Sequence, residues 1–225
     1  MRALLALVVI LLGLLICASA RAQPVSVAIV MAADVSGSID FHRWKLQREG
    51  YAQAVTHPAF LRAVEATPTR SVAIAFVEWS GIAEQRLVVD WTVIRGREDA
   101  ERVADRLRQN DRSFTGSTSI AGALIFAATL LDVCPFRFSR AVVDVSGDGV
   151  NADGSNVETA RDALLTRDVT INGIVIFGPM SEPHLREHYE EHVVGGPGAF
   201  VMVADDEQTF AYALVRKLVR EVAGR

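Results

Sequence analysis

Apolar runs that alternate with amphipathic segments constrain the fold of this chain more than any other feature. Residues 25–33 form an almost unbroken apolar run, as expected for a strand that is covered on both faces of a sheet. Similar runs predict strands at 71–79, 85–93, 140–145, 169–177 and 199–203, and helical patterns cover 40–56, 97–109, 119–133, 157–166, 182–192 and 206–222. This order predicts an α/β, doubly wound, mostly parallel six-stranded sheet. Only Ser80-Gly81 clearly separates the second and third strands, which predicts a hairpin and one antiparallel edge strand.

The first 22 residues have the pattern of an export signal. Arg2 precedes an apolar run from Ala3 to Ile16, and both Ala18-Ser19-Ala20 and Ala20-Arg21-Ala22 fit a small-x-small cleavage site. The alternative is an uncleaved membrane anchor, but the run is short for a membrane span. We therefore expect residues 1–22 to be a signal peptide and 23–225 to be one domain. The mature protein would be periplasmic or secreted, with no stable membrane insertion.

Composition narrows the classes of partner. The formal net charge is −4 and no basic stripe is visible, which disfavours nucleic acid. No G-x-G-x-x-G follows the first strand and no G-x-x-x-x-G-K-[ST] occurs, which disfavours nucleotides. Cys134 is the only cysteine expected after cleavage, so we expect no internal disulfide. Stability must then come from the core and from any bound ligand.

Three polar clusters follow predicted strands or open a predicted helix. They are Asp34 with Ser36 and Ser38, the segment 115–119, and Asp148. In doubly wound sheets, ligands bind beyond the carboxyl ends of the strands. Two neighbouring carboxylates are costly to bury unless a cation pairs with them, and none of the three loops contains Lys or Arg. A divalent cation such as Mg²⁺, which prefers oxygen ligands, would resolve this.

The three clusters together resemble the von Willebrand factor type A (VWA) domain and its metal-ion-dependent adhesion site. Residues 34–38 match the family pattern D-x-S-x-S, and residues 116–124 (GSTSIAGAL) resemble its threonine segment with Thr118 at the threonine. Asp148 matches the aspartate of the family's T-D-G, where Gly147 replaces the usual threonine. The resemblance covers nearly the whole mature chain and implies a Rossmann-like fold. It is closest to exported bacterial proteins whose function is not established.

The resemblance implies a role for each residue of the clusters. Ser36 and Ser38 would bind the ion directly, and Thr118 directly or through water. Asp34 and Asp148 would act directly or through bridging water. The ion, Mg²⁺ or else Mn²⁺ or Ca²⁺, would keep one open position for a Glu or Asp carboxylate of a protein partner. The chain would then be a binding module and not an enzyme.

Other interpretations of the same residues exist. Asp34-x-Ser36-x-Ser38 alone is also typical of a turn followed by a helix N-cap. The strongest functional rival is a hydrolase that uses the ion to activate water. No histidine lies in the three loops to serve as a general base, which argues against it. A third interpretation is a structural subunit whose metal only stabilises the fold.

Two further features carry weaker signals. His184, His188 and His192 form an H-x-x-E-H string extended by one helical turn, which is typical of some zinc peptidases but also of a solvated helix face. Asp144 interrupts a buried strand and is either a structural acid or a support for the metal ligands; we favour the structural role.

Overall fold

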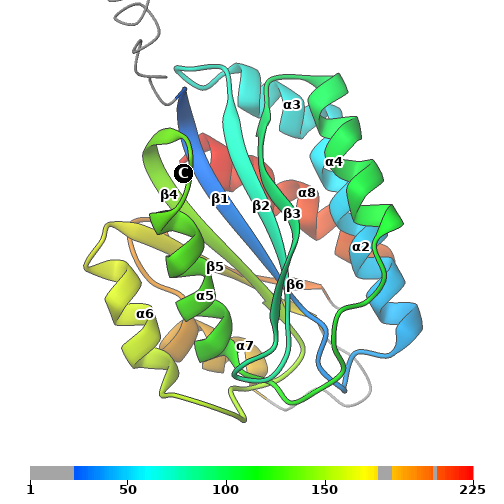
Figure 1. The fold of residues 1–225 in the computed structure, drawn as a ribbon, viewed down its shortest axis with the longest axis vertical. Coiled ribbons are helices and arrows are strands. Elements are labelled where there is room, and N and C mark those ends of the chain that lie inside the picture. The colour runs from blue at the N-terminus through cyan, green and yellow to red at the C-terminus, as the bar shows by residue number, and fades with distance from the viewer. Residues whose placement is uncertain (1–22, 177–183, 205–206, 225) are drawn as a thin grey trace, which may run out of the picture.

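The computed structural model describes residues 23–176, 184–204 and 207–224. Within these residues one six-stranded sheet has the order β3-β2-β1-β4-β5-β6 (Figure 1). The strands are β1 (Pro24–Asp34), β2 (Val72–Trp79), β3 (Gln85–Ile94), β4 (Arg137–Gly147), β5 (Val169–Ile176) and β6 (Val201–Ala204). All neighbours pair in parallel except β2 and β3, which are antiparallel. The predicted α/β sheet with one antiparallel edge strand is confirmed.

Helices cover both faces of the sheet (Figure 1). One face carries α2 (Phe41–Thr56), α3 (Pro58–Glu65), α4 (Arg97–Gln109) and α8 (Glu207–Ala223). The other carries α5 (Ile120–Asp132), α6 (Val157–Leu165), α7 (Leu185–His188) and the π-helix η1 (Tyr189–Val193). The core is therefore split into two layers, one on each side of the sheet.

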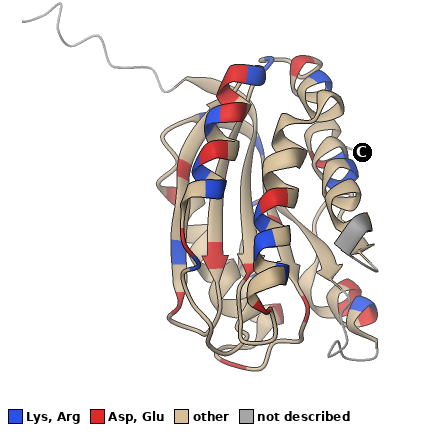
Figure 2. Cartoon of the chain, turned by 90° about the vertical axis from the view of Figure 1, so that its right-hand side faces the viewer, with Lys and Arg blue, Asp and Glu red and all other residues tan. Residues whose placement is uncertain are grey.

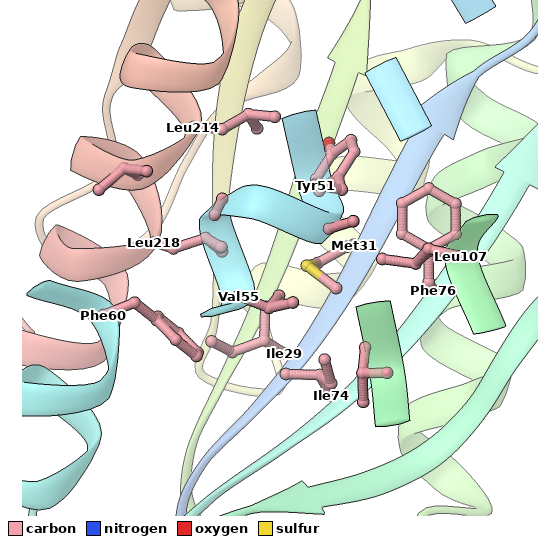
Figure 3. Packing of buried hydrophobic residues seen from close by; sticks show 14 of the residues in the cluster. Ile29, Met31, Tyr51, Val55, Phe60, Ile74, Phe76, Leu107, Leu214 and Leu218 are labelled. Atoms are coloured by element: carbon pink, nitrogen blue, oxygen red, sulfur yellow. The ribbon is translucent and has the colours of Figure 1, made fainter. Parts of the chain in front are cut away.

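Alternation along β1 decides which side chains face which layer. Ile29 and Met31 pack toward α2 and α8 (Figure 3), whereas Ala28 and Val30 pack toward α5. Side chains of a strand alternate with a period of two, so Asp34 belongs to the α5 and η1 side. The first layer is completed by residues of α2, α3 and α8, including Tyr51, Val55, Phe60, Leu214 and Leu218.

Helix α3 was not predicted from the sequence. Pro58 follows the expected end of α2, and from the sequence this proline is interpreted only as a residue that ends that helix. In the structure Pro58 starts the next helix, and the His57 Nδ1 atom accepts a hydrogen bond from Ala59 N at 3.1 Å as its N-cap. Proline suits the first helical turn because its missing N–H has no helical acceptor there.

The prediction of one regular helix at 182–192 is wrong, because the described part of this segment forms a short α-helix followed by a π-helix. Residues 182–183 lie outside the described part of the chain, and His184 has a left-handed φ of 66°. An α-helical turn at Leu185–His188 then widens into η1. Val194 N donates to the carbonyl of Tyr189, five residues earlier, at 2.9 Å. The three histidines of this segment therefore do not share one face of a regular helix.

A buried ionic group joins the central strand β4 to α8. Lys217 Nζ lies 2.5 Å from Asp144 Oδ1 and 2.5 Å from Glu221 Oε1, and all three side chains are fully buried. Asn172 of β5 donates to Glu221 at 3.0 Å. Asp144 thus has a structural ion pair, as favoured from the sequence.

The surface carries interspersed charge. On the side seen in Figure 2, acidic and basic residues alternate along the helices without a basic stripe. Among the described residues no helix is both long and apolar enough to cross a membrane. The expected signal peptide, residues 1–22, lies outside the described part of the chain.

Candidate metal centre

The centre lies where the strand order reverses. β1 and β4 are neighbours in the middle of the sheet, and the chain continues from them toward opposite edges. The loops after these strands meet there, as is usual for ligand sites of doubly wound sheets. The loop before α5, which contains the polar segment 115–119 and is called the second loop below, joins them because Gly37 N donates to the carbonyl of Gly116 at 2.9 Å. A Cβ at position 37 would lie 3.2 Å from the Thr115 carbonyl, so a glycine allows this close approach.

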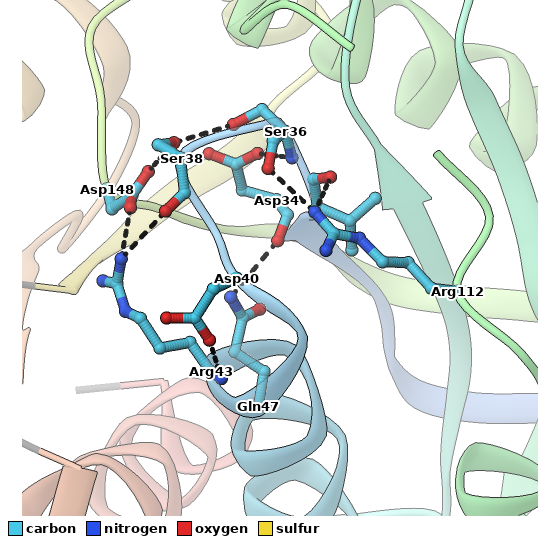
Figure 4. Close-up of polar contacts among 9 residues, drawn as sticks. Asp34, Ser36, Ser38, Asp40, Arg43, Gln47, Arg112 and Asp148 are labelled. Carbon is cyan, nitrogen blue, oxygen red and sulfur yellow. Dashed lines mark hydrogen bonds and ion pairs between the residues drawn. The ribbon is translucent and has the colours of Figure 1, made fainter. Parts of the chain in front are cut away.

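Four of the five predicted ligands form one chain of contacts (Figure 4). Asp34 Oδ1 accepts from Ser36 N at 2.7 Å, and the hydroxyls of Ser36 and Ser38 lie 3.2 Å apart. Ser38 Oγ donates to Asp148 Oδ1 at 2.6 Å. The expected gathering of these side chains from β1 and β4 is therefore present.

Thr118, the fifth predicted ligand, reaches the same end of the sheet. Its carbonyl accepts from Ala152 N at 2.9 Å and from Asp153 N at 3.1 Å, which ties the second loop to the segment after β4. Its hydroxyl lies 3.9 Å from the point where a Cβ of Gly149 would stand, beside Asp148. Thr118 is thus adjacent to the other four side chains without joining their chain of contacts.

The surroundings of Asp34 disfavour a negative charge on its carboxyl group. It is fully buried, and its Oδ2 has no hydrogen-bond partner among the described residues. Burial raises the pKa of Asp34 from 3.8 to about 7; the backbone N–H groups of Ser36 and Asp148 and the Ser36 hydroxyl oppose this shift, and the charge of Asp148 adds to it. A buried acceptor of this kind destabilises the protein unless a cation or a donor contacts it. Together with the neighbouring hydroxyls, it fits a hard divalent cation.

An arginine from outside the three polar clusters contacts Asp148. Arg43, in the first turn of α2, places Nη1 2.7 Å from Asp148 Oδ2 and 3.3 Å from the Ser38 carbonyl (Figure 4). The sequence-based expectation that no protein cation serves these carboxylates is therefore wrong for Asp148. The sequence carries no signal for this contact, since the two residues are 105 positions apart. Within the described residues Asp34 Oδ2 has no such partner, and Arg112 Nη2 donates to the neighbouring carbonyls of Val35 and Ser36 at 2.8 and 2.9 Å.

Polar contacts also hold α2 against the centre. Gln47 Nε2 donates to the Asp34 carbonyl at 3.2 Å. The buried Glu78 of β2 accepts from Trp44 Nε1 at 2.6 Å and from Arg48 Nε at 2.8 Å. These three α2 side chains fix the helix, and with it Arg43, relative to the ends of β1 and β2.

The histidine segment shows a different arrangement from a peptidase site. His192 Nδ1 lies 2.7 Å from Glu158 Oε1, the rings of His188 and His192 are 5.0 Å apart, and His184 is exposed. No group of three or more His, Cys, Asp or Glu side chains that could hold a metal occurs within residues 23–176, 184–204 and 207–224. The candidate centre offers two carboxylates and depends on hydroxyl oxygens for its other ligands.

The strand order, the single antiparallel edge strand and the polar loops at the reversal point define a von Willebrand factor type A fold. Solved structures share it: proximal thread matrix protein 1 of the mussel byssus with a zinc-occupied MIDAS motif superposes with a TM-score of 0.64 at 16% identity, over 89% of this chain and 46% of that one. The vWF domain of the type V pili tip protein Mfa5 from Porphyromonas gingivalis gives a TM-score of 0.59 at 11% identity, over 88% and 95%.

Family membership follows from the sequence itself. Residues 24–225 match the family described as "Protein of unknown function (DUF1194)", and the chain belongs to this family. No curated protein matches it in sequence. A von Willebrand factor type A protein from Catenulispora acidiphila gives a TM-score of 0.57 at 20% identity, over 88% of this chain and 42% of that one. The chain thus spans less than half the length of that protein and of the mussel protein.

Proposed function

We propose that this chain is a metal-dependent protein-binding module of the adhesion type. Asp34, Ser36, Ser38, Thr118 and Asp148 would hold a divalent cation, Mg²⁺ or alternatively Mn²⁺ or Ca²⁺. When bound, the cation would supply an electrophilic position for a Glu or Asp carboxylate of a protein partner. The observation that carries the proposal is the unpartnered, buried Oδ2 of Asp34 beside three hydroxyl-bearing residues and a second carboxylate.

The serines and the aspartates would contribute differently to binding the cation. Ser36 and Ser38 provide neutral oxygens, which contribute ligands without cancelling the positive charge of the cation. Asp34 and Asp148 provide the negative charge that holds the cation in the site. Because Arg43 already compensates part of the charge of Asp148, the site retains a net attraction for an anionic partner group. The fold neighbours that are pilus or byssus proteins support a binding role.

The two rival functions are less well supported. A hydrolase would need a general base beside the cation, but none of the five predicted ligands is a histidine; His42 is exposed in the first turn of α2, His57 caps α3, and the other three histidines lie on or beside α7 and η1. A purely structural metal would not require hydroxyl ligands at an exposed loop such as that of Ser38. We therefore favour a non-enzymatic module that is exported by the segment 1–22 to the periplasm or beyond.

Capture of a partner in the presence and absence of metal tests the proposal. The wild-type chain should retain one or more envelope proteins in Mg²⁺ and release them in EDTA, whereas Asp34→Asn should retain none in either buffer. Asp40→Asn is the matched control, because Asp40 is an exposed N-cap residue and Asn caps helices equally well. Substituting the acidic residues of the captured protein should abolish binding. Capture of the same partner by the wild type and by Asp34→Asn, in Mg²⁺ and in EDTA alike, would contradict the proposal.

Removal of the Arg43 charge should strengthen metal binding. Arg43→Gln deletes a positive charge next to the proposed cation and frees Asp148 Oδ2. We expect the Mg²⁺ affinity, measured by titration calorimetry at low salt, to rise about tenfold, which corresponds to about 1.4 kcal/mol. Arg43→Lys keeps the charge and should remain close to wild type. Weaker Mg²⁺ binding by Arg43→Gln would show that Arg43 supports the site instead of competing with the cation.

A further inference from the structure

Gly147 occupies the position where the VWA pattern usually has threonine. A Cβ at this position would lie 2.5 Å from the hydroxyl of Tyr189 and 3.1 Å from Asp34 Oδ2. The first distance is shorter than real Cβ contacts, so any larger residue would collide with Tyr189. The tyrosine hydroxyl therefore fills the space that a side chain at position 147 would need.

Tyr189 reaches this space from η1, which packs on the same face of the sheet as α5 and α6. It is fully buried at the start of η1, and its ring lies over β5, where a Cβ at Gly173 would be 2.9 Å from Tyr189 Cδ1. Glycines on two neighbouring strands, Gly173 on β5 and Gly147 on β4, thus make room for one aromatic side chain. Asp34, Gly147 and Gly173 all face the same layer by the alternation of their strands.

An unpaired donor and an unpaired acceptor face the same space. Among the described residues, neither the Tyr189 hydroxyl nor Asp34 Oδ2 has a hydrogen-bond partner, and both atoms are buried. Buried polar groups of native proteins are nearly always satisfied, by protein groups or by water. A tyrosine hydroxyl can donate one hydrogen bond, and a carboxylate oxygen can accept one.

We propose that Tyr189 is a positioning residue for Asp34: the Tyr189 hydroxyl donates to one bridging water molecule, which in turn donates to Asp34 Oδ2. Asp34 Oδ1 is already held by Ser36 N at 2.7 Å, so the second contact fixes the whole carboxylate. Tyr189 would thus replace, from a distant helix, the side-chain hydroxyl that the threonine at position 147 would have provided. This inference rests on the proposed metal site, because a fixed Asp34 matters most when it holds a cation.

The test compares the loss of one hydroxyl at two buried tyrosines. Tyr189→Phe should lower the affinity for Mg²⁺ and Mn²⁺ about tenfold by titration calorimetry, as for groups that orient metal ligands. Tyr51→Phe is the control, because Tyr51 is equally buried but packs on the opposite layer against Phe76. Its affinity should stay within about twofold of wild type. Unchanged affinity in Tyr189→Phe, or an equal loss in both variants, would overturn the inference.

Relocating the hydroxyl separates positioning from packing. Gly147→Ser alone should destabilise the fold by collision with Tyr189, whereas Gly147→Ser with Tyr189→Phe should recover part of the lost affinity. A double variant that binds no better than Tyr189→Phe would contradict the role of the hydroxyl.

A metal-free measurement distinguishes failure of the inference from failure of the metal site. In EDTA, the changes in melting temperature of Asp34→Asn and Tyr189→Phe should not add, because each removes one end of the same contact. Additive changes would overturn the inference even if the wild type binds metal. If the wild type binds no cation, the proposed function fails, and non-additive changes would still support the contact.

Discussion

Asp34→Asn should abolish the rise in melting temperature that Mg²⁺ or Mn²⁺ gives the wild-type protein. A cation that binds only the folded state stabilises it by about 2.7 kcal/mol at a hundredfold excess over its dissociation constant. For a chain of this size this corresponds to an increase of roughly 5–10 °C. The substitution removes a buried carboxylate whose Oδ2 has no partner among the described residues, and so removes the main attraction for the cation.

The metal-free variant should be at least as stable as the metal-free wild type. Asp34 is buried next to Asp148, and this environment raises its pKa to about 7, which means that the folded state disfavours its charge. Asn keeps the shape and a carbonyl oxygen for the Ser36 N–H but removes the charge. Thermal unfolding in EDTA and in Mg²⁺ measures both effects, with Asp40→Asn as control. An Asp34→Asn protein that gains stability from Mg²⁺ like the wild type would exclude Asp34 as a metal ligand.

Lys217→Met should cause a large loss of stability. The ammonium group contacts Asp144 and Glu221 at 2.5 Å each, with no solvent access to any of the three side chains. Removing one partner of a buried ionic group costs about 3–5 kcal/mol, because the remaining charges are left uncompensated. We expect the melting temperature to fall by roughly 10 °C or more. The same substitution at the exposed Lys45 should change it little.

The pH dependence provides a check on this group. Burial raises the pKa of Glu221 from 4.5 to about 7; Lys217 opposes this shift, and Asp144 adds to it. The folded state therefore binds this proton more tightly than the unfolded state, so the stability that Glu221 contributes is fully present below about pH 4.5 and is lost as pH rises to about 7. Glu221→Gln should remove up to about 3 kcal/mol of this decrease in pH-dependent chemical denaturation. A slope equal to that of wild type would contradict the assignment.

Much of the fold was predictable from local pattern. Strands buried on both faces produce continuous apolar runs, and the helical spacing of Phe210, Leu214, Leu218 and Val222 matches their burial on one side of the closing helix. The order of these elements predicts the parallel sheet with its antiparallel edge. Errors occurred where one residue has two local meanings, as Pro58 does, or where helical periodicity changes, as it does at Tyr189.

The candidate site was predictable only in part. Asp34, Ser36 and Ser38 stand within five positions of one another, and parallel strands bring their carboxyl ends to one edge, so the meeting with Asp148 could be expected. Thr118 could be placed nearby because its segment opens the helix that precedes β4, and such a helix begins at the edge of the sheet where the parallel strands end. Its exact relation to the other four depends on backbone contacts between the second loop and residues 152–153, which no spacing in the sequence reveals.

The sequence by itself determined the α/β class and the set of oxygen-bearing side chains at the strand ends, because both depend on periodicity within short segments. Only the tertiary structure decided which groups compensate those side chains. Arg43 pairs with Asp148, Tyr189 fills the space over Gly147, and Lys217 neutralises Asp144. Each of these pairs joins elements at least 42 positions apart, and whether two such side chains meet depends on helix packing and on strand alternation together.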